Sequence, residues 1–150
     1  MQLKVPPVAV FLIAMLLLYA GATVLPQFNL SFPGQAFIAM LFVVAAILPG
    51  GQAVLAFVKN KTTVNPTTPD RATTLVTDGF YRLSRNPMYL GLLCLLLALA
   101  VFYGTLTALI IVPAFIWYMT EFQIKPEEDA LRRIFGADYS SYQKRVRRWI

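Results

Sequence analysis

Long apolar runs alternate with short polar stretches along this chain. No charged side chain occurs in residues 5–58 or in residues 86–120. Apolar runs of about 18 residues or more are typical of membrane-spanning helices. The pattern therefore predicts an all-α, polytopic membrane protein. Its four expected spans lie at about residues 5–25, 36–58, 87–103 and 105–122.

The last two runs are separated only by Gly104, which predicts a tight helical hairpin. Both runs are short for a hydrocarbon layer about 30 Å thick. Pro49 and Pro113 lie inside the second and fourth runs, and they are expected to kink or break those helices, because proline lacks a backbone donor. The first run can also be interpreted as a signal peptide, but it exceeds the usual apolar region of about 7 to 15 residues.

Charged residues are confined to one side of the predicted membrane topology. With four spans, every Lys, Arg, Asp and Glu falls on the side that carries both termini, mainly in a loop at 59–86 and a tail at 123–150. The positive-inside rule makes that side cytoplasmic. We therefore expect residues 1–150 to form a single membrane domain with both termini cytoplasmic.

Composition narrows the chemistry available to the protein. The 150 residues are 58% hydrophobic and 13% charged, with a net charge of +6. Basic residues beside membrane spans suit an anionic lipid surface, so nucleic acid is not an expected partner. The chain has no histidine and one cysteine, Cys94, inside an apolar run. These counts exclude a histidine-based triad, a disulfide framework and a thiolate metal site, and no metal is expected.

Residues 85–91, RNPMYLG, lie at the predicted cytoplasmic start of the third span. Asn86 suits the N-cap position and Pro87 the first helical position. A purely structural interpretation is available, in which Arg85 extends to lipid phosphates and Tyr89 sits in the interfacial aromatic belt. The segment alone therefore does not distinguish a membrane anchor from a functional site.

The C-terminal tail predicts two short amphipathic helices separated by Gly136. Pro126 would begin the first helix, followed by three consecutive acids, Glu127, Glu128 and Asp129. Helices that lie on anionic lipid rarely begin with acids, because the surface repels them. We therefore expect these carboxylates to face Arg82, Arg85 or a polar ligand.

Taken together, these segments resemble a known superfamily. LVTDGFYRLSRNPMYLG, followed by an apolar hairpin and then EEDALRRIFGADYSSYQKRVRRWI, is similar to the isoprenylcysteine carboxyl methyltransferase and phospholipid methyltransferase superfamily. The resemblance covers about residues 73–148. It implies S-adenosylmethionine as the cofactor. The implied cofactor-binding residues are Thr73, Thr74, Leu75, Val76, Tyr81, Asn86, Pro87, Met88, Tyr89 and Glu127.

The resemblance also implies where the methyl acceptor lies. Asn86 replaces the histidine of many members, and Gln123 replaces an arginine that eukaryotic prenylcysteine enzymes place four residues before the matching glutamate. Gln123, at the position of that arginine, and Lys125, as a candidate replacement for it, are the expected substrate-binding residues. Some prokaryotic members share Asn86, so the resemblance implies the cytoplasmic (inner) membrane of a prokaryote. Arg85, Glu121 and Glu128 are the candidate catalytic residues. A carboxylate acceptor needs no base, whereas a lipid amine must first lose a proton, for which Glu121 or Glu128 is available.

The sequence thus predicts an integral membrane S-adenosylmethionine-dependent methyltransferase that acts on a lipid-like or lipidated substrate at the cytoplasmic surface. Methyl transfer depends on alignment and desolvation more than on acid–base groups, which suits a chain without histidine. The alternatives are an NADPH-dependent, reductase-like membrane protein and a non-catalytic structural or assembly protein. A proton-coupled exporter is disfavoured, because the long apolar runs contain no carboxylate.

Overall fold

The computed structural model describes residues 5–59 and 74–150, with backbone only for 53–59. Over these ranges the chain is helical, and the one β-type contact is an isolated bridge between Asn29 and Thr105. The helices are α1 (Pro7–Val24), η1 (Pro26–Phe28), α2 (Gln35–Lys59), η3 (Gly79–Arg82), α3 (Pro87–Tyr103), α4 (Ala108–Met119), the π-helical turn η4 (Thr120–Ile124) and α5 (Lys125–Arg145).

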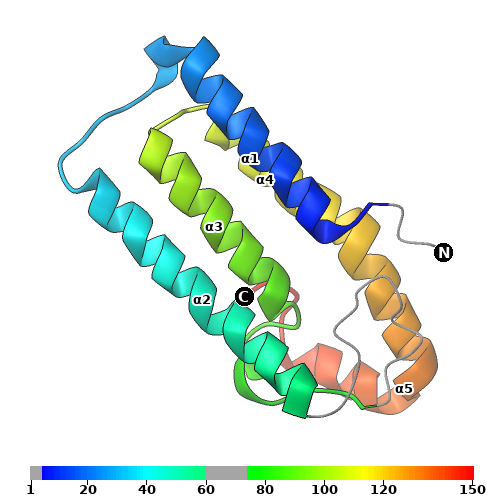
Figure 1. Ribbon diagram of the computed structural model, residues 1–150. Coiled ribbons are helices and arrows are strands. Elements are labelled where there is room, and N and C mark those ends of the chain that lie inside the picture. Colours follow the sequence, from blue (N-terminus) through cyan, green and yellow to red (C-terminus); the bar gives the residue numbers. More distant parts are fainter. Residues whose placement is uncertain (1–4, 60–73) are drawn as a thin grey trace.

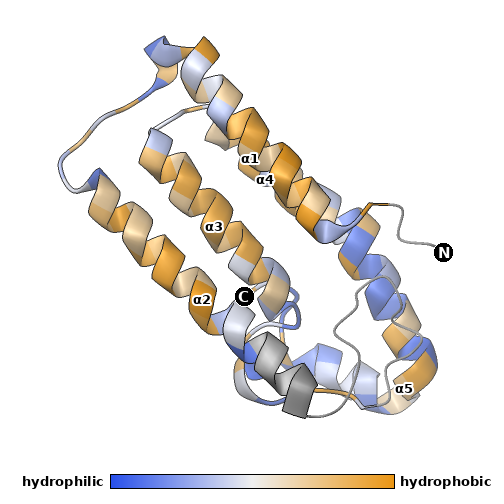
Figure 2. Cartoon of the chain, viewed as in Figure 1, coloured by the Kyte–Doolittle hydropathy of each residue, from blue (hydrophilic) through white to orange (hydrophobic). Residues whose placement is uncertain are grey.

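Helix α3 lies at the centre of the arrangement and contacts α1, α2 and α4 (Figure 1). Its buried side chains, among them Tyr89 and Leu96, pack with Leu18 of α1 and with Phe115 and Met119 of α4. Outward-facing apolar side chains are left exposed on α1, α2 and α4, and Figure 2 shows these helices as predominantly hydrophobic. That combination is the one expected of a helical bundle surrounded by lipid.

Three of the described helices are long and apolar enough to cross a membrane: α1, the Gln35–Gln52 part of α2, and the continuous helix Ala108–Arg145. Helix α3 has the bounds predicted for the third span, but its 17 residues fall just short of that length. The all-helical membrane class is therefore confirmed. The count of four spans and the cytoplasmic placement of the C-terminal helices stay predictions.

Two glycines determine how α3 fits its neighbours. A Cβ atom on Gly91 would lie 3.1 Å from the carbonyl oxygen of Ala46 in α2, so the absence of a side chain permits the close approach of the two helices. Gly104 ends α3 in the left-handed region, with φ 64°, as the predicted hairpin requires. The connection is longer than predicted, because α4 begins only at Ala108.

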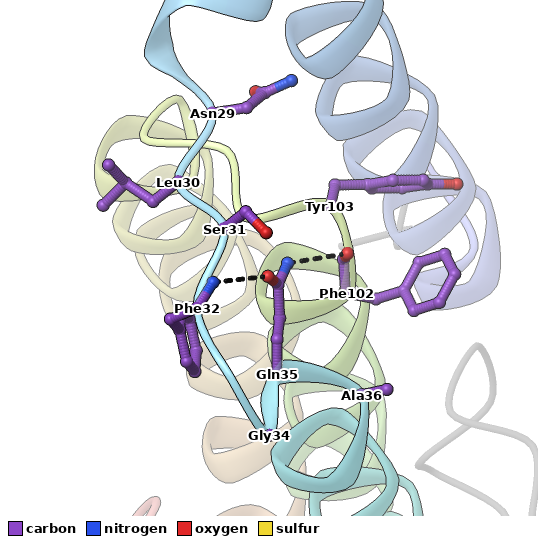
Figure 3. Close-up of a pocket in the computed structure, with 9 residues that line it drawn as sticks. All are labelled: Asn29, Leu30, Ser31, Phe32, Gly34, Gln35, Ala36, Phe102 and Tyr103. Atoms are coloured by element: carbon purple, nitrogen blue, oxygen red, sulfur yellow. Dashed lines mark hydrogen bonds between the residues drawn. The ribbon is translucent and has the colours of Figure 1, made fainter.

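The end of the bundle with the Gly104 turn is joined by backbone hydrogen bonds. Leu30 donates to the carbonyl of Gly104 at 2.7 Å, and Leu106 donates to the carbonyl of Phe28 at 2.9 Å. Beside this turn lies a pocket of about 550 Å³, which Figure 3 shows between the α1–α2 connection and the end of α3. Gln35 points across it and donates to the carbonyls of Val101 and Phe102.

The predicted break at Pro49 is wrong, whereas a kink there stays a prediction. Helix α2 continues through Pro49 without a break. Helix α5 begins at Lys125 with Pro126 in its first turn, as predicted, but it is not a separate helix, because α4 passes through η4 directly into α5. The π-helical turn immediately before Pro126 accommodates the missing backbone donor of the proline within a continuous helix. The predicted end at Gly136 is confirmed as a kink, with φ 50° and ψ −116° inside α5.

Candidate functional site

The predicted functional residues converge where η3, the start of α3 and α5 meet. A second buried cluster joins these elements, formed by Val76 and Tyr81 before α3 and by Tyr139 and Tyr142 in the second half of α5. The hydroxyl of Tyr142 donates to the carbonyl of Tyr81 at 2.6 Å. The kink at Gly136 separates this half of α5 from the acidic first turn, so both parts of the helix can contact the α3 end.

Tyr89 and Glu127 form a polar pair between the first turns of α3 and α5. The Tyr89 hydroxyl, on a side chain only 5% exposed, donates a hydrogen bond to Glu127 Oε1. Burial raises the pKa of the Glu127 carboxyl to about 8, although the hydrogen bond from Tyr89 acts in the opposite direction. Burial and the nearby Tyr142 and Glu127 likewise raise the pKa of Tyr81. Glu127 is therefore a desolvated carboxyl close to two tyrosines.

Arg85 and Glu128 form a buried ion pair beside it. Arg85 Nη2 lies 2.7 Å from Glu128 Oε1, and the two side chains are 10% and 6% exposed. Arg85 Nη1 also donates to the carbonyl of Gln143 at 3.1 Å. Arg148 contacts both oxygens of Glu128, with Nε 3.0 Å from Oε1 and Nη2 2.7 Å from Oε2. One buried carboxylate is thus shared by two guanidinium groups.

The prediction that the three acids face Arg82, Arg85 or a polar ligand is confirmed only for Glu128. Glu128 does face Arg85, but Arg82 pairs with Asp78 at 3.0 Å instead. Asp129 pairs with Arg132 on the exposed side of α5. The reason is the helical period, because consecutive residues point in directions about 100° apart and cannot share one partner surface.

Asn86 occupies the N-cap position of α3, as predicted, but its side chain makes no capping hydrogen bond. It donates instead to the carbonyl of Arg148 at 2.9 Å, while the Asn86 backbone amide donates to Ser84 Oγ at 3.1 Å. Pro87 is fully buried at the first helical position. The first turn of α3 therefore starts without a side-chain cap.

The other predicted cofactor residues differ in their surroundings. Leu75, Val76 and Met88 belong to or pack against the cluster of Tyr81, Tyr139 and Tyr142. Thr74 is exposed at the start of this segment, and Thr73 lies outside the described residues.

The predicted substrate residues lie in and just after η4, and they are not hydrogen-bonded or ion-paired to the Arg85–Glu128 pair in the described part of the chain. Gln123 is completely buried, and its amide donates to the carbonyl of Val5 at the start of α1. Lys125 pairs with Glu121 on a partly exposed surface. Gln123 is thus directed toward the start of α1, and Lys125 and Glu121 form their own ion pair apart from Arg85 and Glu128.

Sequence reasoning missed Ser84, Gln143, Arg148 and Trp149. Ser84 is fully buried, and Trp149 Nε1 donates to Thr120 Oγ1 at 3.1 Å. The sequence signal for Arg148 was the valine-x-arginine pattern at the end of the tail. Arg148 was missed because a basic residue near a chain end usually faces solvent. Among the described residues, no group of three or more His, Cys, Asp or Glu side chains is placed to bind a metal ion.

Comparisons with known proteins bear on this arrangement. Residues 35–138, more than two thirds of the chain, match the model of a family described as phospholipid methyltransferase. An uncharacterised protein of Haemophilus influenzae is 43% identical over 63 residues, which are 42% of this chain and all of that protein. The protein-S-isoprenylcysteine O-methyltransferase of Schizosaccharomyces pombe is 32% identical over 72 residues, which are 48% of this chain and 30% of that enzyme. No solved structure matches.

Proposed function

The chain belongs to the phospholipid methyltransferase family, and from this premise we propose that it is an integral membrane methyltransferase that uses S-adenosylmethionine. Its acceptor is a lipid-like or lipidated molecule whose carboxylate or amine is methylated at the cytoplasmic membrane surface. The observation that carries the proposal is the pairing of Tyr89 with the buried Glu127 beside the uncapped start of α3.

The residues present fit the cofactor. S-adenosylmethionine supplies a methyl group on a sulfonium, together with a carboxylate, an ammonium and ribose hydroxyls. The first-turn amides of α3 suit the carboxylate, because a helix start favours anions. Glu127 would accept hydrogen bonds from the ribose hydroxyls or the ammonium. The aromatic faces of Tyr81 and Tyr89 suit the adenine or, by cation–π attraction, the sulfonium.

The contacts of Glu121 and Glu128 distinguish these two candidate bases. Both oxygens of Glu128 are engaged by Arg85 and Arg148, so this carboxylate has little capacity left for a substrate proton. Among the described residues Glu121 pairs with Lys125, and its side chain is 35% exposed, so it is the more accessible of the two. For an amine acceptor we therefore assign proton removal to Glu121. Lys125, the ion-pair partner of Glu121, would contact the acceptor head group, whereas Gln123 is buried against the start of α1.

Direct ligand binding tests the proposal. Detergent-purified protein is titrated with S-adenosylmethionine, S-adenosylhomocysteine and NADPH, with Glu127→Ala and Asn86→Ala beside it. Asp129→Ala is the matched control, because Asp129 lies in the same turn of α5 but is largely exposed. We expect saturable binding of the two sulfur compounds, lost in Glu127→Ala, weakened in Asn86→Ala and retained in the control.

Two results would contradict the proposal. Binding of NADPH in place of the sulfur compounds would assign the site to a reductase-like protein. Absence of binding by folded protein would favour a structural or assembly role. If S-adenosylhomocysteine binds as expected, acceptors are then screened by transfer of a labelled methyl group to lipid carboxylates and lipid amines.

A further inference from the structure

The last five residues, Val146–Ile150, follow α5 without regular secondary structure, with Val146 in an extended conformation and bends at positions 146 and 148, and they return to the start of α3. We call them the C-terminal strap. Three groups immediately before α3 donate to its backbone: the amide of Arg85 to the carbonyl of Arg147 at 3.0 Å, and Ser84 Oγ and Asn86 Nδ2 to the carbonyl of Arg148 at 3.4 and 2.9 Å. The strap is thus bonded to the residues that lead into the candidate cofactor site.

Side chains fix the strap at two points. Arg148 makes a bidentate contact with Glu128, whose side chain is 6% exposed. Trp149 donates to Thr120 and packs against the apolar cluster shared by α1, α3 and α4. A planar guanidinium that contacts both carboxylate oxygens has a defined orientation, which a flexible ammonium group would lack.

Arg148 therefore links Glu128, Arg85 and Asn86. Its guanidinium orients Glu128, which in turn binds Arg85, and its carbonyl accepts the Asn86 amide. The hydrogen bond from the Asn86 side chain to the Arg148 carbonyl affects the first turn of α3. The Asn86 side chain would otherwise be free to cap the first turn of α3, because asparagine is among the preferred N-cap residues. Bonded to the strap, it leaves that turn uncapped.

We propose that Arg148 is a positioning residue for the candidate cofactor site, which keeps Asn86 away from the first turn of α3 and orients Arg85 through Glu128. The inference rests on the proposed function in one respect, that the open turn receives the carboxylate of the cofactor. Arg148 itself contacts neither cofactor nor acceptor in this account. Its effect reaches the ligand through the positions of Asn86 and Arg85.

The test compares Arg148→Ala and Arg148→Lys with Arg147→Ala in the full-length, detergent-purified protein. Arg147 is the matched control, because it is the adjacent arginine, its side chain is exposed, and its replacement changes the net charge equally. The first measurement needs no ligand. Hydrogen exchange at the Arg85 amide, which donates to the strap carbonyl of Arg147, should accelerate in Arg148→Ala and stay unchanged in Arg147→Ala, because only the former releases the strap.

The second measurement is the affinity for S-adenosylhomocysteine and for methylthioadenosine, which has the nucleoside but lacks the amino-acid part. We expect Arg148→Ala to weaken S-adenosylhomocysteine binding about tenfold or more, with little change for methylthioadenosine. Arg148→Lys should recover the affinity only in part, and it also serves if the alanine variant does not fold. A merely structural role would weaken both ligands together, in step with a lower unfolding temperature.

The outcomes are separable. Unchanged exchange of the Arg85 amide in both Arg148 variants would overturn the positioning role, whatever the ligand. Equal S-adenosylhomocysteine affinity in the Arg148 variants and the wild type would overturn it as well. If the wild type binds neither sulfur compound while the exchange result holds, the strap positions α3 as inferred, and it is the proposed cofactor that fails.

Discussion

The hydroxyl of Tyr89 in the first turn of α3 donates a hydrogen bond to the carboxyl group of Glu127 in the first turn of α5, although 38 residues separate them in the chain. Both belong to the blocks that carry the family resemblance. The hairpin of α3 and α4 returns the chain to the same end of the bundle, and η4 carries it on into α5 (Figure 1). The contact therefore links the two blocks directly.

Tyr89→Phe removes this hydrogen bond and keeps the aromatic ring. Glu127 then lies buried without its donor, so the free energy of unfolding should fall by about 1–3 kcal/mol. Thermal unfolding in detergent measures the loss. Tyr103→Phe, which removes a hydroxyl at the other end of α3, is the control and should stay close to the wild type. An equal loss in both variants would mean that the Glu127 contact contributes nothing specific.

The raised pKa of Glu127 predicts how stability depends on pH. Burial places the folded-state pKa near 8, above the ordinary value of 4.5, so the folded protein retains a proton that the unfolded chain releases between these values. Stability should therefore be highest below about pH 4.5, fall as the pH rises from there to about 8, and level off above it. The chain has no histidine that would titrate in this range.

Glu127→Gln provides the measurement for this pH dependence. The amide cannot ionise, so the decline of the unfolding temperature between pH 6 and 8 should be absent or much smaller in the variant. The loss in the wild type is expected to be on the order of 1–2 kcal/mol. Parallel curves of unfolding temperature against pH for the wild type and the variant would show that ionisation of Glu127 does not destabilise the fold.

Gly91 determines the close packing of α2 against α3. In Gly91→Val the new side chain meets the backbone of α2 at Ala46 and Gly50, which can yield only by moving the helix. We expect destabilisation of about 1–3 kcal/mol, typical of overpacking. Gly51→Val is the matched control, because nothing lies within 4 Å of a Cβ atom at that position. Urea or thermal unfolding of both variants should separate them clearly.

The predicted orientation can be tested with single cysteines. Replacing Cys94, the only cysteine, with serine gives a background without thiols. We expect Ser31→Cys, beside the Gly104 turn, to react with an impermeant maleimide in intact cells. Ser140→Cys in α5 should react only after the membrane is opened. The reverse labelling pattern would place both termini on the outer side, and labelling of both positions in intact cells would contradict the span count.

Much of the fold was accessible from the sequence, because membrane helices are encoded locally. The bounds of α3 and the turn at Gly104 follow from the apolar run and the glycine, and the kink at Gly136 follows in the same way. The continuity across Pro126 did not follow from local propensity. A proline after a polar turn ordinarily begins a helix, and only packing of α4 and η4 shows that this one lies inside a continuous helix.

For the candidate site, too, the sequence determined some features and the tertiary structure determined others. The sequence by itself determined the residue types available at the polar end of the membrane domain, since hydropathy confines charge to that end and the two family blocks supply Arg85, Asn86, Tyr89 and the acids of α5. Only the tertiary structure decided which of them meet. Glu127 contacts Tyr89, Glu128 is shared by Arg85 and Arg148, and Asn86 bonds to the C-terminal strap rather than to its own helix. Partner choice among several arginines and carboxylates depends on helix rotation and on the return of the last five residues, and both are set by long-range packing that no local pattern records.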